Sequence, residues 1–403
     1  MKILIVTQYF WPESFRINDL ALGLLERGHE VSVLTGKPNY PSGSFFEGYS
    51  FSKKSDEDWK GIKIYRSNLI PRGKSGGIRL MLNYLSFAFF AFFKSLFIKE
   101  KYDLIFVYEP SPITVGIPAV FLSKKLKVPM YFWVQDLWPE SVSVAGQIEN
   151  KFILGILDRL TRWIYKNSKK VLIQSEGFRE YILNQKVSND KIIYYPNSTE
   201  SMFGIVKPSE NIRKLVPRVP FSIMFAGNIG EAQDFENILS TAKKIKGNTS
   251  DIHFIILGSG RKKDYVFQKI KEYDLESNFH LLGSFPVDTM PHFFACSDAL
   301  LVTLKKSKIF SLTIPSKIQS YLACGKPIIA GLDGEGAKVI KESKSGFTAP
   351  SSDSKKLEKA IMKLYTSSLE ERKEFGNNAI KYFNDNFERE RLLTKLIEIF
   401  ENE

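Results

Sequence analysis

Two series of short apolar segments, separated by helical stretches, constrain the fold of this chain more than any other feature. The first series covers residues 2–7, 30–35, 62–67, 103–109, 130–135, 170–175 and 191–196. The segments are rich in β-branched residues and are apolar throughout rather than at alternate positions. This pattern is typical of strands buried on both faces of a parallel sheet covered by helices. The first part of the chain is therefore predicted to be a doubly wound α/β domain.

The second series predicts another parallel α/β domain. It covers residues 221–227, 253–260, 279–284, 299–304 and 327–332, and the segment 197–220 before it is rich in Pro, Ser and charge, as linkers are. We predict an N-terminal domain over 1–197, a C-terminal domain over 198–385 and a final helix, 386–403, that packs back on the N-terminal domain. Because ligands of open α/β sheets bind beyond the carboxyl ends of the strands, we expect the two domains to face each other across a cleft.

The charge of the chain indicates an anionic partner. The formal net charge is +13, which favours nucleic acid, an anionic membrane or substrate phosphates. Eleven Lys and Arg but only four Asp and Glu lie between residues 53 and 101, around the apolar segment 78–101. Asn83 and Lys94 interrupt that segment, so it is too short for a membrane span. A helix lying in the membrane interface and an ordinary core helix both remain possible.

Cysteine and histidine usage points to a reducing compartment and to no metal site. Two cysteines, Cys296 and Cys324, cannot form a disulfide framework, and the four histidines show no zinc-ligand spacing. The N-terminal sequence lacks the pattern of a signal peptide. We therefore expect a cytoplasmic protein without a metal or another cofactor.

Three segments after strands of the second series favour an anion such as a diphosphate. In "MFAGNIGEAQD", Gly227 permits close backbone approach and Asn228 offers hydrogen bonds, while "LGSGRKKD" places Arg261 after a glycine pair. In "IPSKIQSYLACGKPIIA", Ser316 is expected to cap a helix and Lys317 adds a cation to its N-terminal dipole. Such a site could stabilise a diphosphate leaving group without a metal. An ordinary capped helix with an exposed lysine is the alternative.

Polar residues also follow strands of the first series. A carboxylate at the carboxyl edge of the sheet could accept the proton of an attacking hydroxyl, and Trp138 could stack on a sugar or a lipid. Alternatively, the carboxylates cap helices or pair with the arginine, and Trp138 belongs to the core. The charged residues expected to converge at this edge are Glu13, Arg16, Glu109, Asp136 and Glu140.

Taken together, these motifs resemble the bacterial glycosyltransferases of family 4, which have the two-domain GT-B fold. The resemblance covers nearly the whole chain and includes "RGHEVSVLT", "QDLWPES", "SEGFREYI", "YPNSTE" and "LGSFPVDTMPHFFACSDALLVTL". The segments "AGNIGEAQD", "TIPSKIQSYLACGKPIIA" and "FWPESFRIND" are most similar to the WbuB-like branch. This resemblance implies transfer of N-acetyl-L-fucosamine, or a similar deoxyamino sugar, in O-antigen assembly.

The chain departs from the family at four positions of the donor site. Where the family commonly has two glutamates before the "ACG" turn, this chain has Leu312 and Ser320. Where the family has the Arg and Lys that hold the donor diphosphate, it has Asn228 and Gln233. The resemblance therefore predicts the fold, but the donor contacts of this chain must come from residues other than those of the family.

We hypothesise that neighbouring residues replace the missing donor contacts. Lys317, together with Arg261, would supply the lost positive charge. Asn228, Gln319 or Ser320 would supply hydrogen bonds. With Gly227 and Ser316, these residues form the predicted site for a nucleotide-sugar donor.

The resemblance also bears on the stereochemical course and on the acceptor. Family members typically retain the anomeric configuration of the donor, but an inverting course would need a base, for which Asp136 is the first candidate and Glu109 the second. The acceptor implied is a polyprenyl diphosphate-linked sugar. Its diphosphate would lie near the basic segment 53–101 of an enzyme bound peripherally to the inner face of the cytoplasmic membrane. The residues expected to contact it are Glu13, Arg16, Trp138 and Glu140.

Two other functions are compatible with parts of the sequence. A nucleotide-sugar epimerase of the same architecture would act on the donor alone and would have no use for the basic, apolar helix. A nonenzymatic nucleic-acid binder is suggested by charge only, and the basic residues lack the interleaved aromatics of stacking platforms. We therefore expect no nucleic-acid partner.

Overall fold

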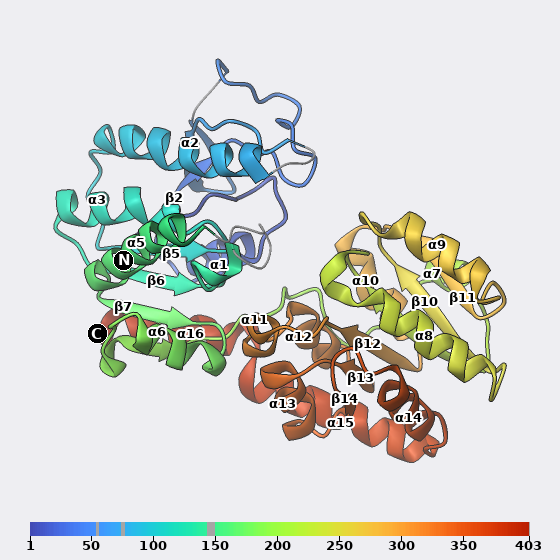
Figure 1. The fold of residues 1–403 in the computed structure, drawn as a ribbon. Helices are drawn as coiled ribbons and strands as arrows, with labels where there is room; N and C mark the ends of the chain where they lie inside the picture. The colour runs from blue at the N-terminus through green and yellow to red at the C-terminus, as the bar shows by residue number, and fades with distance from the viewer. Residues whose placement is uncertain (54–55, 74–76, 143–149, 403) are drawn as a thin grey trace. The chain divides into compact units, whose positions relative to one another are not determined.

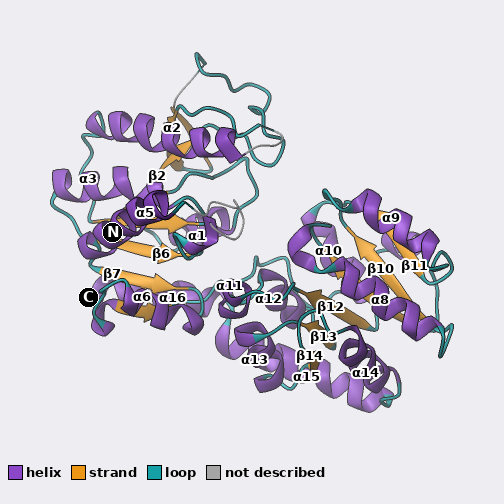
Figure 2. Cartoon of the chain, viewed as in Figure 1, coloured by secondary structure: helices purple, strands orange, loops and turns teal. Residues whose placement is uncertain are grey.

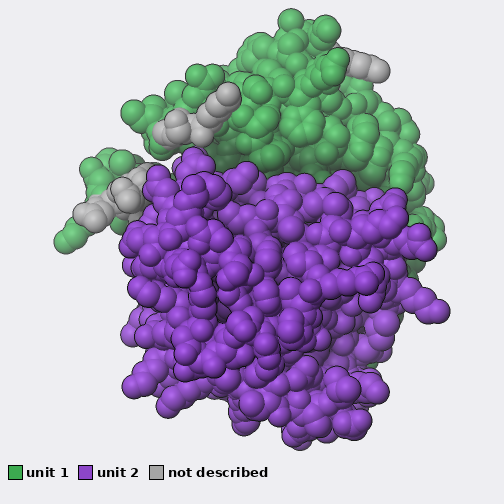
Figure 3. All heavy atoms as spheres, turned by 90° about the vertical axis from the view of Figure 1, so that its right-hand side faces the viewer, with its two compact units in different colours: residues 1–196, 390–403 green, residues 197–389 purple. Residues whose placement is uncertain are grey.

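The computed structural model describes residues 1–403 except 54–55, 74–76, 143–149 and 403. The chain forms two compact units, coloured separately in Figure 3: unit 1 contains residues 1–196 and 390–403, and unit 2 contains residues 197–389. The first boundary thus lies one residue before the predicted one. The chain returns to unit 1 at residue 390 rather than 386, because the helix α15 (Leu369–Asn386) continues through that position in unit 2.

Unit 1 is built on an eight-stranded sheet with the order β3-β4-β2-β1-β5-β6-β7-β8. Figure 1 labels four of these strands, β2, β5, β6 and β7. All neighbouring strands are parallel except β3 and β4. The strands are β1 (Lys2–Val6), β2 (Glu30–Gly36), β3 (Asp56–Trp59), β4 (Ile62–Ser67), β5 (Leu104–Glu109), β6 (Met130–Val134), β7 (Lys170–Ile173) and β8 (Ile192–Tyr194).

Helices cover both faces of this sheet (Figure 2). On one face, α1 and the C-terminal helix α16 share a core with β1, β2, β4 and β5, in which Leu392, Leu396 and Phe400 of α16 are buried. The helices α2 and α3 pack on the other face. The helices of unit 1 are α1 (Arg16–Glu26), α2 (Gly77–Leu96), α3 (Gly116–Leu126), α5 (Lys151–Asn167), α6 (Arg179–Asn184) and α16 (Arg389–Asn402).

Unit 2 is built on a six-stranded sheet with the order β11-β10-β9-β12-β13-β14, in which every neighbouring pair is parallel. Its strands are β9 (Phe221–Ala226), β10 (Ile252–Leu257), β11 (Phe279–Gly283), β12 (Ala299–Thr303), β13 (Ile328–Gly331) and β14 (Gly346–Ala349). Its helices before α15 are α7 (Glu210–Leu215), α8 (Phe235–Lys246), α9 (Lys263–Glu272), α10 (Met290–Ala295), α11 (Lys308–Leu312), α12 (Ser316–Ala323), α13 (Gly334–Glu342) and α14 (Ser354–Tyr365).

The predicted fold class, two doubly wound α/β units, is confirmed. Each of the twelve segments predicted as a strand contains a strand of the structure. Two further strands, β3 ("DEDW") and β14 ("GFTA"), lie at the outer edges of their sheets and carry no continuous apolar run. Except for Ala349, their residues are exposed or only half-buried, so the apolar pattern does not reveal them.

Most of the apolar segment 78–101 lies in α2, which ends at Leu96, five residues before the predicted end. The two faces of this helix differ. One face is buried and carries Asn83, Phe87, Ala88, Ala91 and Ser95. The other face is apolar but exposed, so α2 is a core helix on one face only. Its exposed residues are Ile78, Met81, Leu82, Leu85, Phe89, Phe93 and Leu96, followed by Phe97. Within the part of the chain that the structure describes, no helix combines the length and apolarity of a membrane span.

Candidate functional site

The carboxyl edge of the unit 2 sheet is formed by glycine loops that pack backbone to backbone. The Gly227 amide after β9 donates to the Leu257 carbonyl at 2.8 Å. A Cβ on Gly258, after β10, would lie 1.8 Å from the Gly227 carbonyl oxygen, and both glycines have positive φ, +139° and +140°. Since L side chains rarely adopt such a conformation, glycine is required where these two loops touch.

Helix α12 begins at this edge and brings Lys317 to the first loop. The Nζ atom of Lys317 lies 3.0 Å from Oε1 of Gln233 and 3.6 Å from the ring centroid of Phe225. A Cβ on Gly227 would lie 2.6 Å from Cε and 2.8 Å from Nζ of this lysine. The lysine side chain therefore extends across Gly227, where only the absence of a side chain leaves room for it.

Burial weakens the charge of Lys317 in the ligand-free protein. It lowers the pKa of the ammonium from 10.5 to about 7, because the buried group loses its hydration. A diphosphate bound here would supply the missing negative charge. The positive end of the α12 helix dipole, at Ser316, also favours an anion.

The start of α12 differs from the prediction in one detail. Ser316 is the first residue of the helix, and Pro315 occupies the cap position with extended backbone angles. The expectation that Ser316 caps the helix is therefore wrong. Proline pre-sets this backbone geometry and has no side chain that bonds the first turn.

Two other predicted donor residues flank the glycine loops. The Oδ1 atom of Asn228 would lie 2.4 Å from a Cβ on Gly260, so this side chain lies against the second loop. Arg261 follows Gly260 directly and is exposed. The structure thus gathers Gly227, Asn228, Arg261 and Lys317 around the ends of β9 and β10.

Gln319 and Ser320 lie apart from this group. Gln319 is fully buried, and its amide lies 3.1 Å from the carbonyl oxygen of Pro315 and 3.0 Å from that of Ser316, as a donor to both. The Oγ of Ser320 lies 2.9 Å from Oγ1 of Thr199. Both side chains are thus committed to contacts inside unit 2, which the residue types alone do not reveal.

Sequence reasoning missed two cations at the same edge. The carboxylate of Glu231, in the turn after β9, pairs with Lys262 at 2.7 Å and with Lys305, which follows β12. The hydrogen bonds from these two lysines lower the pKa of Glu231 to about 2. The runs "GRKK" and "LKK", each soon after a predicted strand, were the available signal.

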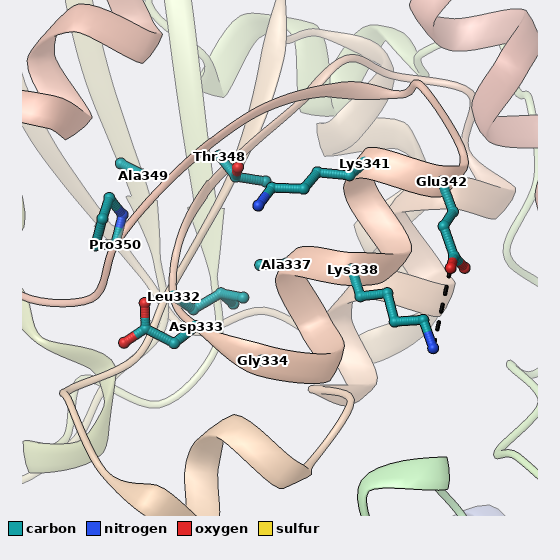
Figure 4. A pocket seen from close by; sticks show the side chains of 10 residues that line it. All are labelled: Leu332, Asp333, Gly334, Ala337, Lys338, Lys341, Glu342, Thr348, Ala349 and Pro350. Carbon is teal, nitrogen blue, oxygen red and sulfur yellow. Dashed lines mark ion pairs between the residues drawn. The ribbon is translucent and has the colours of Figure 1, made fainter.

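A cavity of about 680 Å³ lies elsewhere in unit 2 (Figure 4). It opens between α13 and the carboxyl ends of β13 and β14, and the Asp333 side chain at its floor bonds Ser351. None of the predicted donor residues lines it. Its lining residues are Leu332, Asp333, Gly334, Ala337, Lys338, Lys341, Glu342, Thr348, Ala349 and Pro350.

In unit 1, the two candidate bases lie side by side at the ends of β5 and β6. The Gln135 amide donates to the Glu109 carbonyl at 3.1 Å, which aligns the two loops. Burial raises the pKa of Asp136 to about 7. Burial, and then the charge of Asp136, raises the pKa of Glu109 well above its usual value. A carboxylate whose pKa lies near 7, such as Asp136, can accept a proton at neutral pH, as a general base must.

Aromatic side chains line the same edge beside Asp136. Tyr84 of α2 packs edge-on against Trp138, with ring centroids 6.2 Å apart, and Trp138 is buried. Burial raises the pKa of Tyr84, and Asp136 raises it further. Burial and then Tyr84 raise the pKa of Tyr9, the third residue after β1. The loops after β1, β5 and β6 therefore meet around Tyr84, a residue that the sequence analysis did not select.

Glu13 is held by backbone amides of the loop after β2. Its Oε1 accepts from the N–H groups of Asn39 at 2.8 Å and Tyr40 at 2.7 Å. Burial nevertheless raises its pKa to about 7, because the carboxylate is almost wholly removed from water. Arg16, the first residue of α1, is partly buried.

Glu140 is engaged differently from the other predicted acceptor residues. Its Oε2 accepts a hydrogen bond from the hydroxyl of Tyr181 in α6. The same hydroxyl lies 2.9 Å from the carbonyl oxygen of Trp138. These contacts tie the loop after β6 to α6. Over the described ranges, no group of three or more His, Cys, Asp or Glu is arranged to hold a metal ion.

The fold and two domain matches identify the chain as a glycosyltransferase of the GT-B fold. Residues 14–198 match the glycosyl transferase 4-like domain, and residues 209–382 match the domain of glycosyl transferases group 1. The two matches cover most of unit 1 and unit 2 respectively. The predicted enzyme class is therefore confirmed.

Curated relatives agree with this class. The chain is 28% identical over 229 residues to the probable glycosyltransferase WbjE of Pseudomonas aeruginosa, covering 55% of this chain and 56% of that protein. It is 24% identical to the putative colanic acid biosynthesis glycosyl transferase WcaI of Escherichia coli, covering 81% of this chain and 82% of the relative. The WbjE match thus spans little more than half the length of that relative.

A solved structure shows the same fold over the full length. Anabaena HepE, determined in complex with UDP, has a TM-score of 0.71 at 13% identity, and the match covers 100% of both chains. At this identity the likeness establishes the fold alone.

Proposed function

We propose that this enzyme transfers a sugar from a nucleotide diphosphate donor to a polyprenyl diphosphate-linked sugar during assembly of a surface polysaccharide. The proposed donor sugar is a deoxyamino sugar such as N-acetyl-L-fucosamine, and O-antigen is the proposed product class. The relative WcaI carries the name of colanic acid biosynthesis, and HepE binds UDP in its crystal structure, which supports this direction.

The observation that carries the donor half of the proposal is the position of Lys317. Its ammonium lies at the first turn of α12, over Gly227, and has no carboxylate partner among the described residues. A donor diphosphate placed here would contact this cation at the positive end of the α12 helix dipole. When the bond between the anomeric carbon and the diphosphate breaks, the negative charge grows on the leaving oxygen. Lys317 would stabilise that charge without a metal or another cofactor.

The acceptor half rests on the carboxylates of unit 1. In the proposed transfer, an acceptor hydroxyl oxygen bonds to the anomeric carbon, the nucleoside diphosphate leaves with the electrons of the broken bond, and the hydroxyl loses its proton. On an inverting course Asp136 would accept this proton, with Glu109 as the second candidate. Glu13, Arg16, Trp138 and Glu140 remain the proposed acceptor contacts.

The lipid part of the acceptor is supported by α2. Its exposed apolar residues recur about every three to four positions and therefore form one stripe, which can enter the headgroup layer of a bilayer. Exposed cations at both ends, Arg79, Lys99 and Lys101, complement anionic lipids. We therefore propose peripheral binding to the inner face of the cytoplasmic membrane.

One experiment tests the proposed reaction. A panel of UDP- and GDP-sugars is incubated with the purified protein and a lipid-linked N-acetylglucosamine acceptor, and the products are read by mass spectrometry. Transfer of a deoxyamino sugar supports the proposal. An isomerised donor in the absence of acceptor would instead identify an epimerase, and no product from any donor in the panel would contradict the proposed donor class.

A further inference from the structure

Asn83 is a polar residue on the buried face of an otherwise apolar helix. It is fully buried in α2, and its amide has three partners. Its Oδ1 accepts from Nε2 of Gln8 at 2.7 Å. Its Nδ2 donates to the Ile70 carbonyl at 2.7 Å and to Oδ1 of Asn39 at 3.3 Å. Packing alone would favour an apolar residue at this position. The hydrogen bonds of the Asn83 amide therefore fix how α2 packs against the segments that contain Gln8, Asn39 and Ile70.

These partners lead directly to the acceptor edge of unit 1. Gln8 lies in the loop after β1, and Asn39 lies in the loop after β2. The backbone N–H of Asn39 donates to Oε1 of Glu13 at 2.8 Å, and its Oδ1 also accepts from the Arg72 amide at 3.1 Å. A chain of hydrogen bonds thus runs from Asn83 through Asn39 to Glu13, and every member is buried or partly buried.

The opposite face of the same helix is the exposed apolar stripe. Leu82 and Leu85, on either side of Asn83 in sequence, are 42% and 50% exposed. The next residue after Asn83, Tyr84, contacts Trp138 at the acceptor edge. One turn of α2 therefore carries exposed apolar residues, the amide that bonds the loops after β1 and β2, and an aromatic contact to the loop after β6.

We propose that Asn83 is a positioning residue that transmits contact between α2 and a lipid surface to the acceptor loops, residues 8–15 and 37–43. When the apolar stripe is held by the bilayer, α2 becomes a fixed support, and the Asn83 hydrogen bonds order the two loops around Glu13. Vesicle binding then lowers the KM for the acceptor and leaves the KM for the donor, which unit 2 holds, unchanged. This inference rests on the proposed membrane-bound acceptor.

Amide hydrogen exchange of the full chain tests this link without any substrate. Vesicles of phosphatidylethanolamine and phosphatidylglycerol are the probe. In the wild-type protein we expect vesicle binding to slow exchange of peptides 8–15 and 37–43 by roughly fivefold or more, the lower end of typical coupling between sites. In Asn83→Ala the vesicles still bind through the intact stripe, but the slowing is lost.

Two further variants keep the test decisive. Asn83→Asp keeps the oxygen that accepts from Gln8 and loses the N–H that donates to Asn39. In this variant, vesicles should still slow amide exchange in residues 8–15 but no longer in 37–43. This variant keeps the test usable even if Asn83→Ala folds poorly. Ser95→Ala is the matched control, because Ser95 is equally buried in α2 but its hydroxyl bonds only the Phe92 carbonyl of its own helix. It should behave as the wild type.

The outcomes separate this inference from the proposed function. Unchanged exchange in the vesicle-bound wild type, or full slowing in Asn83→Ala, would overturn the link. The acceptor KM, measured with a water-soluble short-chain acceptor, should fall on vesicle addition in the wild type and Ser95→Ala but not in Asn83→Ala. If exchange slows as expected while no sugar is transferred from any donor, the link stands and the proposed reaction fails.

Discussion

The ammonium of Lys317 lies 3.0 Å from the amide oxygen of Gln233. By the resemblance, Gln233 occupies the position at which the family has a donor-binding lysine. The contact between the two side chains supports the proposal that Lys317 supplies this positive charge instead. A neutral amide orients the ammonium without cancelling its charge. The charge that Lys317 carries below about pH 7 is therefore not neutralised by this contact and can pair with a bound diphosphate.

Replacing Lys317 by alanine should weaken donor binding. Loss of a charged hydrogen bond typically costs about 1.5–3 kcal/mol, so we expect the dissociation constant of the active donor's nucleoside diphosphate to rise by about tenfold or more. Isothermal titration calorimetry measures it. Lys359→Ala, an exposed lysine of α14, is the control and should bind as the wild type does. An affinity within a factor of two of wild type in Lys317→Ala would remove this lysine from the donor site.

Donor affinity should depend on pH through the same group. Burial lowers the pKa of Lys317 to about 7, so its charge is present below pH 7 and lost above it in the free protein. Because only the charged form pairs with the diphosphate, affinity should fall as pH rises above about 7. Lys317→Arg stays charged and should flatten this part of the profile. An equally steep profile in Lys317→Arg would assign the pH dependence to another group.

Stability should respond to pH in the opposite direction. Between about pH 7 and 10 the unfolded chain keeps the proton of Lys317 and the folded chain does not. By linkage, the free energy of unfolding contributed by this group rises with pH across that window. Urea unfolding of wild type and Lys317→Met at several pH values measures the contribution. The difference in the free energy of unfolding between the two proteins should vary with pH between about 7 and 10 and vary less below pH 7. A difference that stays constant from pH 6 to 10 would be inconsistent with the lowered pKa.

The sequence predicted the fold more completely than the site. Continuous apolar runs mark central parallel strands, and these lie where expected, whereas β3 and β14 at the sheet edges left no such mark. Residue type and strand ends also located Gly227 and Lys317. They could not show that Gln319 bonds its own helix or that Ser320 bonds Thr199, because those partners depend on packing between distant segments.

Gly227→Ala should impair donor binding by displacing Lys317. The new Cβ would lie 2.8 Å from Nζ of that lysine, and the φ of +139° disfavours any L side chain. We expect donor affinity to fall about as far as in Lys317→Ala, with some loss of thermal stability. Gly204→Ala is the matched control, because nothing lies within 4 Å of its Cβ position and its φ is not positive. Normal donor binding in Gly227→Ala would mean that the lysine does not need its present position.

Asp136→Asn should reduce turnover without weakening the donor complex. General base catalysis typically contributes about 10²–10⁴-fold, so kcat should fall by at least about a hundredfold. Burial raises the pKa of Asp136 to about 7, so wild-type kcat should fall as pH drops below 7, where the base is protonated. The control Asp158→Asn removes a carboxylate of unit 1 that pairs with Arg162 on α5. If the product, identified by NMR, retains the donor anomeric configuration, or if Asp136→Asn turns over normally, Asp136 is not the base.

The double variant Phe89→Asp, Phe93→Asp should abolish membrane binding while leaving the fold intact. Both rings belong to the stripe on α2 and are 56% and 45% exposed, so their loss should change the free energy of unfolding by less than about 1 kcal/mol. Each buried ring contributes about 2 kcal/mol to insertion, and two added carboxylates repel anionic lipid. Sedimentation with phosphatidylglycerol vesicles should therefore show at least about a hundredfold weaker binding.

The matched control is Phe267→Asp, which replaces a similarly exposed ring (52%) on α9 of unit 2. This variant should bind vesicles as the wild type does. Equal vesicle binding by the double variant and the wild type at low salt, where electrostatic attraction is greatest, would exclude α2 as the membrane contact.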